Sequence, residues 1–168
     1  MRISHNRLIA FLIALSVAFS VTSCSKAKAI GDITFDSPIM ALLFEEGTDV
    51  GDTGYGVVYR KVNDMDLLLS QETVPVLVVF MDGRALSNSA IAFTEELCDK
   101  FSSSARIVRV NVELIENSAK INNLVSMFGV TDYPWFAVAY KGQKGKSISG
   151  YSVKLESDII TMLQEAAK

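Results

Sequence analysis

The chain has 168 residues, of which 49% are hydrophobic and 21% charged, with a formal net charge of −3 and a single histidine, His5. This is enough for one globular domain. His5 lies in a segment that we expect to be removed, which excludes sites that depend on a histidine base or on histidine zinc ligands. The two cysteines are too few for a thiolate-only zinc site or a multi-disulfide framework.

Residues 1–23 have the layout of a secretory signal. Arg2 and Arg7 precede an apolar run over residues 8–21, which is short for a membrane-spanning helix. The run ends in Val21-Thr22-Ser23-Cys24, which resembles the lipobox of bacterial lipoproteins. The resemblance implies that Cys24 is acylated and becomes the new N-terminus. The alternative is an ordinary signal peptide in which two small residues precede a cysteine by chance.

A lipidated Cys24 would anchor the protein at a bacterial cell membrane or outer membrane, facing away from the cytoplasm, since several acyl chains on one residue bind stably. Removal of residues 1–23 leaves 14 Lys and Arg against 19 Asp and Glu, a net charge of −5. That sign argues against nucleic acid as a partner.

Residues 24–56 are predicted to form a tether and a peripheral segment, because half of the ten glycines fall between residues 31 and 56. Within this segment, Ser37 and Pro38 precede the string IMALLFEE, and Gly47 follows it. Ser as N-cap, Pro at the first helical position and Gly as a stop predict a short helix over residues 38–46. We expect this helix to pack on the main domain or to dock onto a partner.

Residues 57–168 alternate between strand and helix patterns. We expect, in order, a strand at 57–62, a helix capped by Asn63 to about 71, a strand at 74–80, a helix at about 88–103, a strand at 106–112, a helix around 121–128, strands at 135–140 and 147–151, and a helix around 155–163. This order predicts an α/β domain with a central mixed β-sheet flanked by helices on both faces.

Three strings in this domain are similar to the thioredoxin family. VPVLVVF at 74–80 resembles the central strand before the active-site loop, and ISGY at 148–151 resembles the family's ending before the last helix. FGVTDYP at 128–134 resembles the approach to the family's cis-proline. The resemblance implies a thioredoxin-like fold with a cis bond between Tyr133 and Pro134, because cis bonds are essentially confined to proline.

The redox members of this family carry two cysteines, spaced C-x-x-C, at the start of the helix after the central strand, where the helix N-terminus lowers a thiol pKa. The corresponding loop here contains no cysteine: it reads Asp82-Gly83-Arg84-Ala85-Leu86-Ser87-Asn88. Depending on a one-residue shift, Arg84 and Ser87 or Ala85 and Asn88 replace the thiols. Val79 replaces the family's buried carboxylate. The resemblance therefore implies a domain without dithiol exchange, since that reaction requires a thiolate.

Other residues near this loop have simpler interpretations. Cys98 shares the apolar stripe of its helix and is predicted to be buried with a raised pKa, although a thiol oxidoreductase using Cys98 is the alternative. Ser87 and Ser89 are predicted to cap the helix rather than act as nucleophiles. Asp82 and Arg84 are predicted to form a solvated ion pair, with ligand contact as the alternative.

The family also holds extended polypeptides beside the residue before its cis-proline, whose backbone pairs with the bound chain. This implies a peptide-binding site at Tyr133, Pro134 and Trp135, and alternation places both aromatic side chains opposite Phe136; for Trp135, burial in the core is the alternative. We expect a membrane-anchored lipoprotein that binds a protein or extended peptide in the cell envelope, with no cofactor and no metal. A structural subunit of an envelope complex is an alternative.

Overall fold

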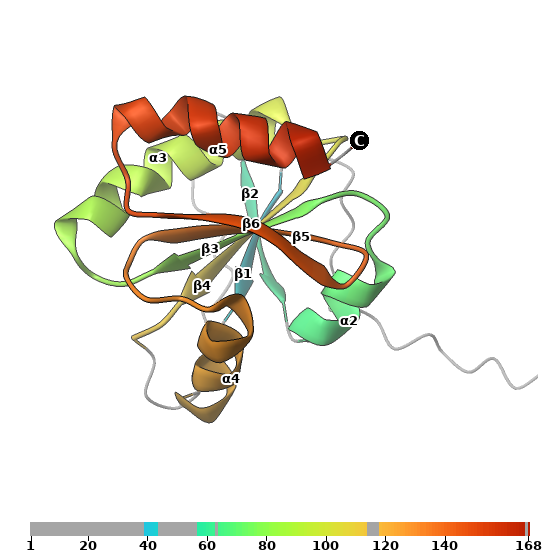
Figure 1. Cartoon of the computed structure of the whole chain (residues 1–168), viewed down its shortest axis with the longest axis horizontal. Helices are drawn as coiled ribbons and strands as arrows, with labels where there is room; N and C mark the ends of the chain where they lie inside the picture. The colour runs from blue at the N-terminus through green and yellow to red at the C-terminus, as the bar shows by residue number, and fades with distance from the viewer. Residues whose placement is uncertain (1–38, 44–56, 63, 114–117, 167) are drawn as a thin grey trace, which may run out of the picture.

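The computed structural model describes residues 39–43, 57–62, 64–113, 118–166 and 168. Within these ranges, six strands form one sheet in the order β2-β1-β4-β3-β5-β6 (Figure 1). β1 to β4 run parallel to one another, whereas β5 is antiparallel to both of its neighbours, β3 and β6. The strands are β1 (Ile39–Leu43), β2 (Val58–Val62), β3 (Val76–Met81), β4 (Arg106–Asn111), β5 (Trp135–Tyr140) and β6 (Gln143–Ser149).

Helices cover both faces of this sheet (Figure 1). The helices of the described ranges are α2 (Met65–Gln71), α3 (Ala85–Lys100), α4 (Ser118–Phe128) and α5 (Val153–Ala166). α3 and α5 pack on one face, and α2 and α4 pack on the other. The predicted α/β class with a mixed, two-sided sheet is therefore confirmed. No helix in the described ranges has the length and apolar character needed to cross a membrane.

The sequence of strand β3 is apolar without alternation because both faces of the strand are buried. Leu77, Val79 and Met81 face the core cluster under α3 and α5. The intervening residues of the strand, Val76, Val78 and Phe80, face the cluster under α2 and α4. A strand between parallel and antiparallel neighbours with helices above and below is buried on both faces, which requires a continuous apolar run.

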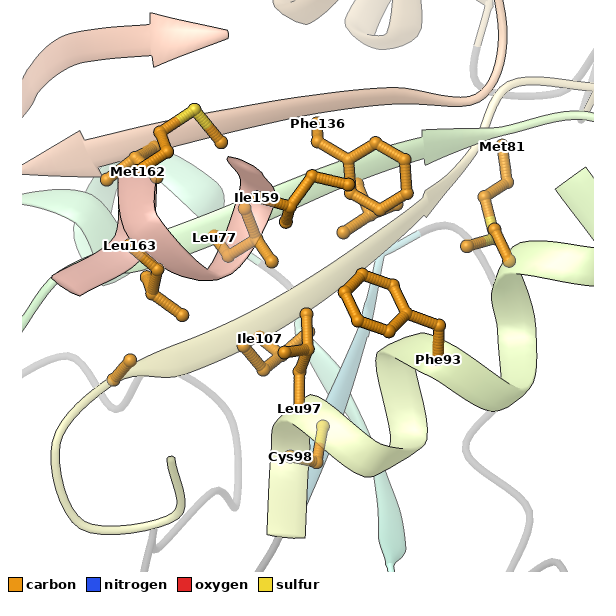
Figure 2. Packing of buried hydrophobic residues seen from close by; sticks show 14 of the residues in the cluster. Leu77, Met81, Phe93, Leu97, Cys98, Ile107, Phe136, Ile159, Met162 and Leu163 are labelled. Atoms are coloured by element: carbon orange, nitrogen blue, oxygen red, sulfur yellow. The ribbon is translucent and has the colours of Figure 1, made fainter. Parts of the chain in front are cut away.

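The larger core cluster joins α3 and α5 to the sheet (Figure 2). Phe93 of α3 meets Phe136 of β5 edge to face, with ring centroids 6.4 Å apart. Leu97 of α3 and Leu163 of α5 are almost completely buried in the same cluster. Burying one such leucine contributes about 1.5–3 kcal/mol. This packing fixes α3, and with it the loop that precedes α3, on the sheet.

The short helix predicted over residues 38–46 is wrong, because Ile39–Leu43 forms strand β1. β1 lies between β2 and β4, with Ala41 opposite Arg60 on one side and Val108 on the other. Two flanking ladders satisfy its backbone groups, and a short apolar run fits a strand with parallel neighbours on both sides. The sheet thus begins before residue 57, so the segment 24–56 is not wholly peripheral. Ser37, Pro38 and Gly47 lie outside the described residues.

Several element boundaries also differ from the predicted ones. α3 begins at Ala85 rather than at residue 88. The prediction missed its first turn because that turn is largely exposed and carries no apolar pattern. β6 begins at Gln143 rather than at residue 147, and its first four residues are exposed edge positions without alternation. Helix α2 is capped by Asp64, whose Oδ1 accepts a 3.0 Å hydrogen bond from the Leu67 amide. The predicted cap, Asn63, lies outside the described residues.

Candidate functional site

The loop between β3 and α3 lies against the turn that precedes β5. Nη2 of Arg84 donates to Asp132 Oδ1 at 2.8 Å and to the carbonyl oxygen of Tyr133 at 2.7 Å. Its guanidinium carbon also lies 5.7 Å from the centroid of the Tyr133 ring. The Tyr133–Pro134 bond is cis, as predicted. The structure therefore brings two of the sequence-predicted regions, residues 82–88 and 133–135, into direct contact.

Asp82 organises the β3–α3 loop. Its Oδ1 accepts from the Arg84 amide at 3.1 Å and from the Ser87 hydroxyl at 2.8 Å, and its Oδ2 accepts from Arg84 Nε at 2.5 Å. Asp immediately after a strand commonly stabilises a turn through bonds of this kind to residues a few positions ahead. The predicted Asp82–Arg84 ion pair is present, and it extends to Asp132.

The capping role predicted for two serines is wrong. Ser87 donates to Asp82, and the N-cap of α3 is Arg84, which makes no side-chain capping bond. Ser89 bonds back to the Ala85 carbonyl at 3.0 Å, one turn earlier in the helix. Ser87 is nearly fully buried and its acceptor is an ionised carboxylate, so the arrangement gives no nucleophile access to a substrate.

The ion-pair network shifts the pKa of each member. Burial acts most strongly on Asp82 and opposes its ionisation, but the bonds from Ser87 and Arg84 together outweigh it and lower the pKa. The pKa of Asp132 is lowered by its bonds from Arg84 and the Tyr133 amide, and that of Arg84 is raised by Asp132 and Asp82. Burial, followed by the charge of Asp82, raises the pKa of the Tyr133 phenol.

The remaining loop residues carry no thiol. Ala85, Leu86 and Asn88 are exposed in the first turn of α3. Val79 is fully buried in the cluster under α3 and α5, so the position of the family's carboxylate is apolar. Whichever one-residue shift is chosen, no sulfur lies at either redox position.

Cys98 is buried, as predicted. It is 2% exposed on the core side of α3 (Figure 2), and burial, followed by the charge of Glu95, raises the pKa of its thiol far above the ordinary value. A thiol with so little thiolate and so little exposure is a poor nucleophile. Cys98 also lies on the opposite half of α3 from the loop that holds Arg84.

Sequence reasoning missed a polar group in the core beside Cys98. The Tyr59 hydroxyl donates to Glu95, and the Arg109 guanidinium lies 5.3 Å from the centroid of the Tyr59 ring. The available signal was helical spacing, because Ile91, Glu95 and Cys98 fall on one face of α3 at i, i+4 and i+7. Burial and the bond to Glu95 raise the pKa of Tyr59, so the phenol stays protonated as a donor.

A cavity of about 180 Å³ opens beside the loop, at the carboxyl ends of β3 and β4. Its lining mixes polar and apolar side chains and includes Asn88, Asn111 and Arg109. Gly83 permits a close approach of the Glu113 carboxylate, since a Cβ there would lie 3.0 Å from both of its oxygens. Among the described residues, no three His, Cys, Asp or Glu side chains are grouped so that they could hold a metal ion.

The aromatic residues that flank Pro134 lie on the side opposite Phe136, as alternation predicts. Tyr133 and Trp135 pack against the cluster under α2 and α4, whereas Phe136 belongs to the other cluster. Pro134 is buried, and both aromatic residues are half-buried. The Trp135 Nε1–H group is buried and has no hydrogen-bond partner among the described residues, which is consistent with a side chain oriented toward the core.

No protein-family model matches this chain, and no curated protein matches it. Solved structures do. Spinach chloroplast thioredoxin f is 11% identical with a TM-score of 0.50, over 60% of this chain and 84% of that one. Mitochondrial thioredoxin 3 of Saccharomyces cerevisiae is 15% identical with a TM-score of 0.50, over 60% and 86%. A chain from a complex of ferredoxin:thioredoxin reductase with thioredoxin f2 is 12% identical with a TM-score of 0.53, over 79% and 98%. The chain therefore has a thioredoxin-like fold.

Proposed function

We propose that this protein is a lipid-anchored, extracytoplasmic thioredoxin-like protein that binds or positions a protein or extended peptide in the bacterial envelope without dithiol exchange. The observation that carries the proposal is the β3–α3 loop. Its exposed positions hold Ala85, Leu86 and Asn88, and an Arg84-centred ion-pair network stands beside the cis-proline turn. The proposal requires no cofactor and no metal.

The absence of sulfur from the loop supports the non-redox part of the proposal. Exchange with a disulfide begins with attack by a thiolate, and the buried Cys98 is in its protonated form at neutral pH. The alternative of an oxidoreductase using Cys98 is tested by alkylation with iodoacetamide at pH 7.5. We expect the Cys98-containing peptide to be modified at least about 100-fold more slowly in the native protein than in urea, because burial removes both access and thiolate.

Rapid alkylation of native Cys98, at a rate close to that in urea, would favour the enzyme. Protection until unfolding favours the binding protein. The other alternative was a structural subunit that docks through a helix at residues 38–46. That alternative no longer has its docking helix, because Ile39–Leu43 is a strand between two others.

The surface around the loop supports binding of another chain. Leu86, in the first turn of α3, is 52% exposed and offers an apolar side chain beside the loop. The half-buried Tyr133 is in contact with Arg84, which precedes Leu86 by two positions, and aromatic residues are enriched where partners bind. Trp135 packs on the core and contributes less of this surface.

Binding is tested by a photo-reactive amino acid placed at position 86 in cells, with position 100 as the matched control. Both positions are exposed on α3, but Lys100 lies at the opposite end of the helix, about 20 Å away. We expect a defined crosslinked species from position 86 only. Equal crosslinking from both positions, or none from either, would contradict binding at the loop.

The proposed anchor lies at Cys24, outside the described residues. A labelled fatty acid should be incorporated into the wild-type protein, which should fractionate with membranes because several acyl chains bind stably. The Cys24→Ser variant should lose the label and appear in the soluble fraction. Retention of Cys24→Ser in the membrane fraction without label would argue for an uncleaved signal segment instead.

A further inference from the structure

The backbone N–H and C=O groups of Tyr133 are both hydrogen-bonded to side chains of the same molecule. Its N–H donates to Asp132 Oδ1 at 2.8 Å, and its carbonyl oxygen accepts from Arg84 Nη2 at 2.7 Å. Among the described residues, neither group has a backbone partner. One carboxylate and one guanidinium therefore take both main-chain hydrogen-bonding groups of the residue before Pro134.

The residues that follow have ordinary backbone partners. The Pro134 carbonyl accepts from the Gly150 amide at 2.8 Å, and Trp135 is paired with Phe80 on one side and Ser149 on the other. Tyr133 lies directly before this ladder, and its backbone could pair with the backbone of another polypeptide chain. Main-chain groups without a backbone partner, such as these at the edge of the β5 ladder, can pair with an added strand.

The two side chains are also bonded to each other. Arg84 Nη2 lies 2.8 Å from Asp132 Oδ1, so a single nitrogen joins the carboxylate and the carbonyl. On its other side, Arg84 Nε is held by Asp82, which is itself fixed by Ser87. The guanidinium is therefore positioned by the β3–α3 loop and reaches across to the cis-proline turn. Breaking its contacts with the turn leaves the contact with Asp82 intact.

This cross-connection is accessible to solvent. The side chains of Arg84 and Asp132 are 52% and 58% exposed. Exposed ion pairs contribute little to stability and are weakened by salt. The connection is therefore weak enough to be displaced by a chain that supplies its own backbone groups.

We propose that Arg84 and Asp132 form a latch that occupies the Tyr133 N–H and C=O and closes this edge to an added strand until the latch is displaced. The inference rests on the proposed function, because it concerns how a bound chain gains access to the same site. In the closed form, an incoming chain competes with two intramolecular side-chain bonds. In the open form, the Tyr133 backbone is free to pair, and Arg84 remains attached to Asp82.

The test compares binding of a reduced, carboxymethylated protein, a permanently extended chain without free thiols, to the full-length wild type and three variants. Arg84→Ala frees the carbonyl, and Asp132→Ala frees the amide. Lys146→Ala is the matched control, because it breaks an exposed ion pair with Glu165 at 2.6 Å away from the turn. Thermal unfolding followed by circular dichroism checks that all four proteins are folded.

We expect Arg84→Ala and Asp132→Ala each to bind the extended chain about tenfold more tightly than wild type at 20 mM salt, since each variant removes one competing hydrogen bond. The Lys146→Ala variant should bind like wild type. At 0.5 M salt the wild type should approach the two latch variants, because screening weakens the ion pair that closes the edge.

Two results overturn the latch, and they are distinguishable. If wild type binds the extended chain and both latch variants bind equally or more weakly, Arg84 and Asp132 are ligands of the chain or bystanders; the latch is refuted and the proposed function stands. If neither wild type nor any folded variant binds the extended chain at either salt concentration, then the latch and the proposed peptide binding both fail.

Discussion

Asp82 and Asp132 are the two carboxylates that share the Arg84 guanidinium. Both carboxyl groups have a native pKa below the ordinary 3.8, Asp82 because the Ser87 and Arg84 bonds exceed the opposing effect of burial, and Asp132 because of Arg84 and the Tyr133 amide. A carboxyl group with a depressed native pKa stabilises the fold above its unfolded pKa. That contribution is lost as the pH falls through the native values, below pH 3.8.

This predicts the outcome of an NMR titration of the side-chain carboxyl carbons. In the wild type, Asp82 and Asp132 should both titrate below pH 3.8, and Arg84→Ala should shift both midpoints upward because it removes their shared cation. Glu165 is the internal control: its pKa is lowered by Lys146, and it should be unchanged in Arg84→Ala. Unshifted Asp82 and Asp132 midpoints in the variant would show that Arg84 does not engage them in solution.

At the residue scale, the sequence predicted the features that depend on residues close together in the chain. The Phe-Gly-Val-x-x-Tyr-Pro string predicted the cis bond before Pro134, and helical spacing predicted the burial of Cys98. It did not predict that Arg84 reaches Tyr133, because these residues are separated by 48 intervening positions and meet only when β3 and β5 pair. A long, exposed arginine side chain has no periodicity that indicates where its guanidinium will bind.

Helix α3 has one leucine on its buried face and another on its exposed first turn, so substitutions of the two can be compared. Leu97 is completely buried between the helix and the sheet, whereas Leu86 is 52% exposed in the first turn. Leu97→Ala should lower the free energy of unfolding by about 2–5 kcal/mol, the cost of a large-to-small core substitution. Leu86→Ala should change it by less than about 0.5 kcal/mol. Urea unfolding at equilibrium measures both, and similar losses in the two variants would contradict the orientation of α3.

Strand β1 is the element for which local signals and tertiary context disagree. The Ser-Pro start and the following Gly are those of a helix, but five apolar residues between two parallel strands form a ladder on each side instead. Local propensity is a weak prior that such pairing overrides. β3 and β5 were predictable in type from their continuous apolar runs and β4 from its alternating valines, whereas the exposed start of β6 had no such pattern.

A proline in β1 tests its central position. Ala41→Pro removes a backbone donor from a strand paired on both sides, so we expect a loss of several kcal/mol, about 3 or more, or failure to fold. The Ala41→Val variant keeps the donor, favours extended backbone and should remain folded. Far-ultraviolet circular dichroism with thermal unfolding distinguishes them. A stable, cooperatively folded Ala41→Pro protein would be compatible with a peripheral helix and would contradict a central strand.

At the scale of the whole molecule, the fold is thioredoxin-like, but the loop after β3, residues 82–88, contains no cysteine. The scaffold has a mixed sheet with helices on both faces, a cis-proline turn and a helix that begins at the loop after β3, and solved thioredoxins share this fold. Sequence reasoning could predict the fold because it depends on periodicity and a few turn residues, but a partner is recognised by a surface assembled from distant segments.

The most direct test of this account measures the reduction of insulin disulfides by dithiothreitol, followed by turbidity, with a redox-active thioredoxin as positive control. The account predicts that the protein leaves the uncatalysed rate unchanged, because the β3–α3 loop contains no cysteine to exchange disulfides and Cys98 is buried as a thiol. Acceleration well above the uncatalysed rate that disappears in the Cys98→Ser variant would contradict it.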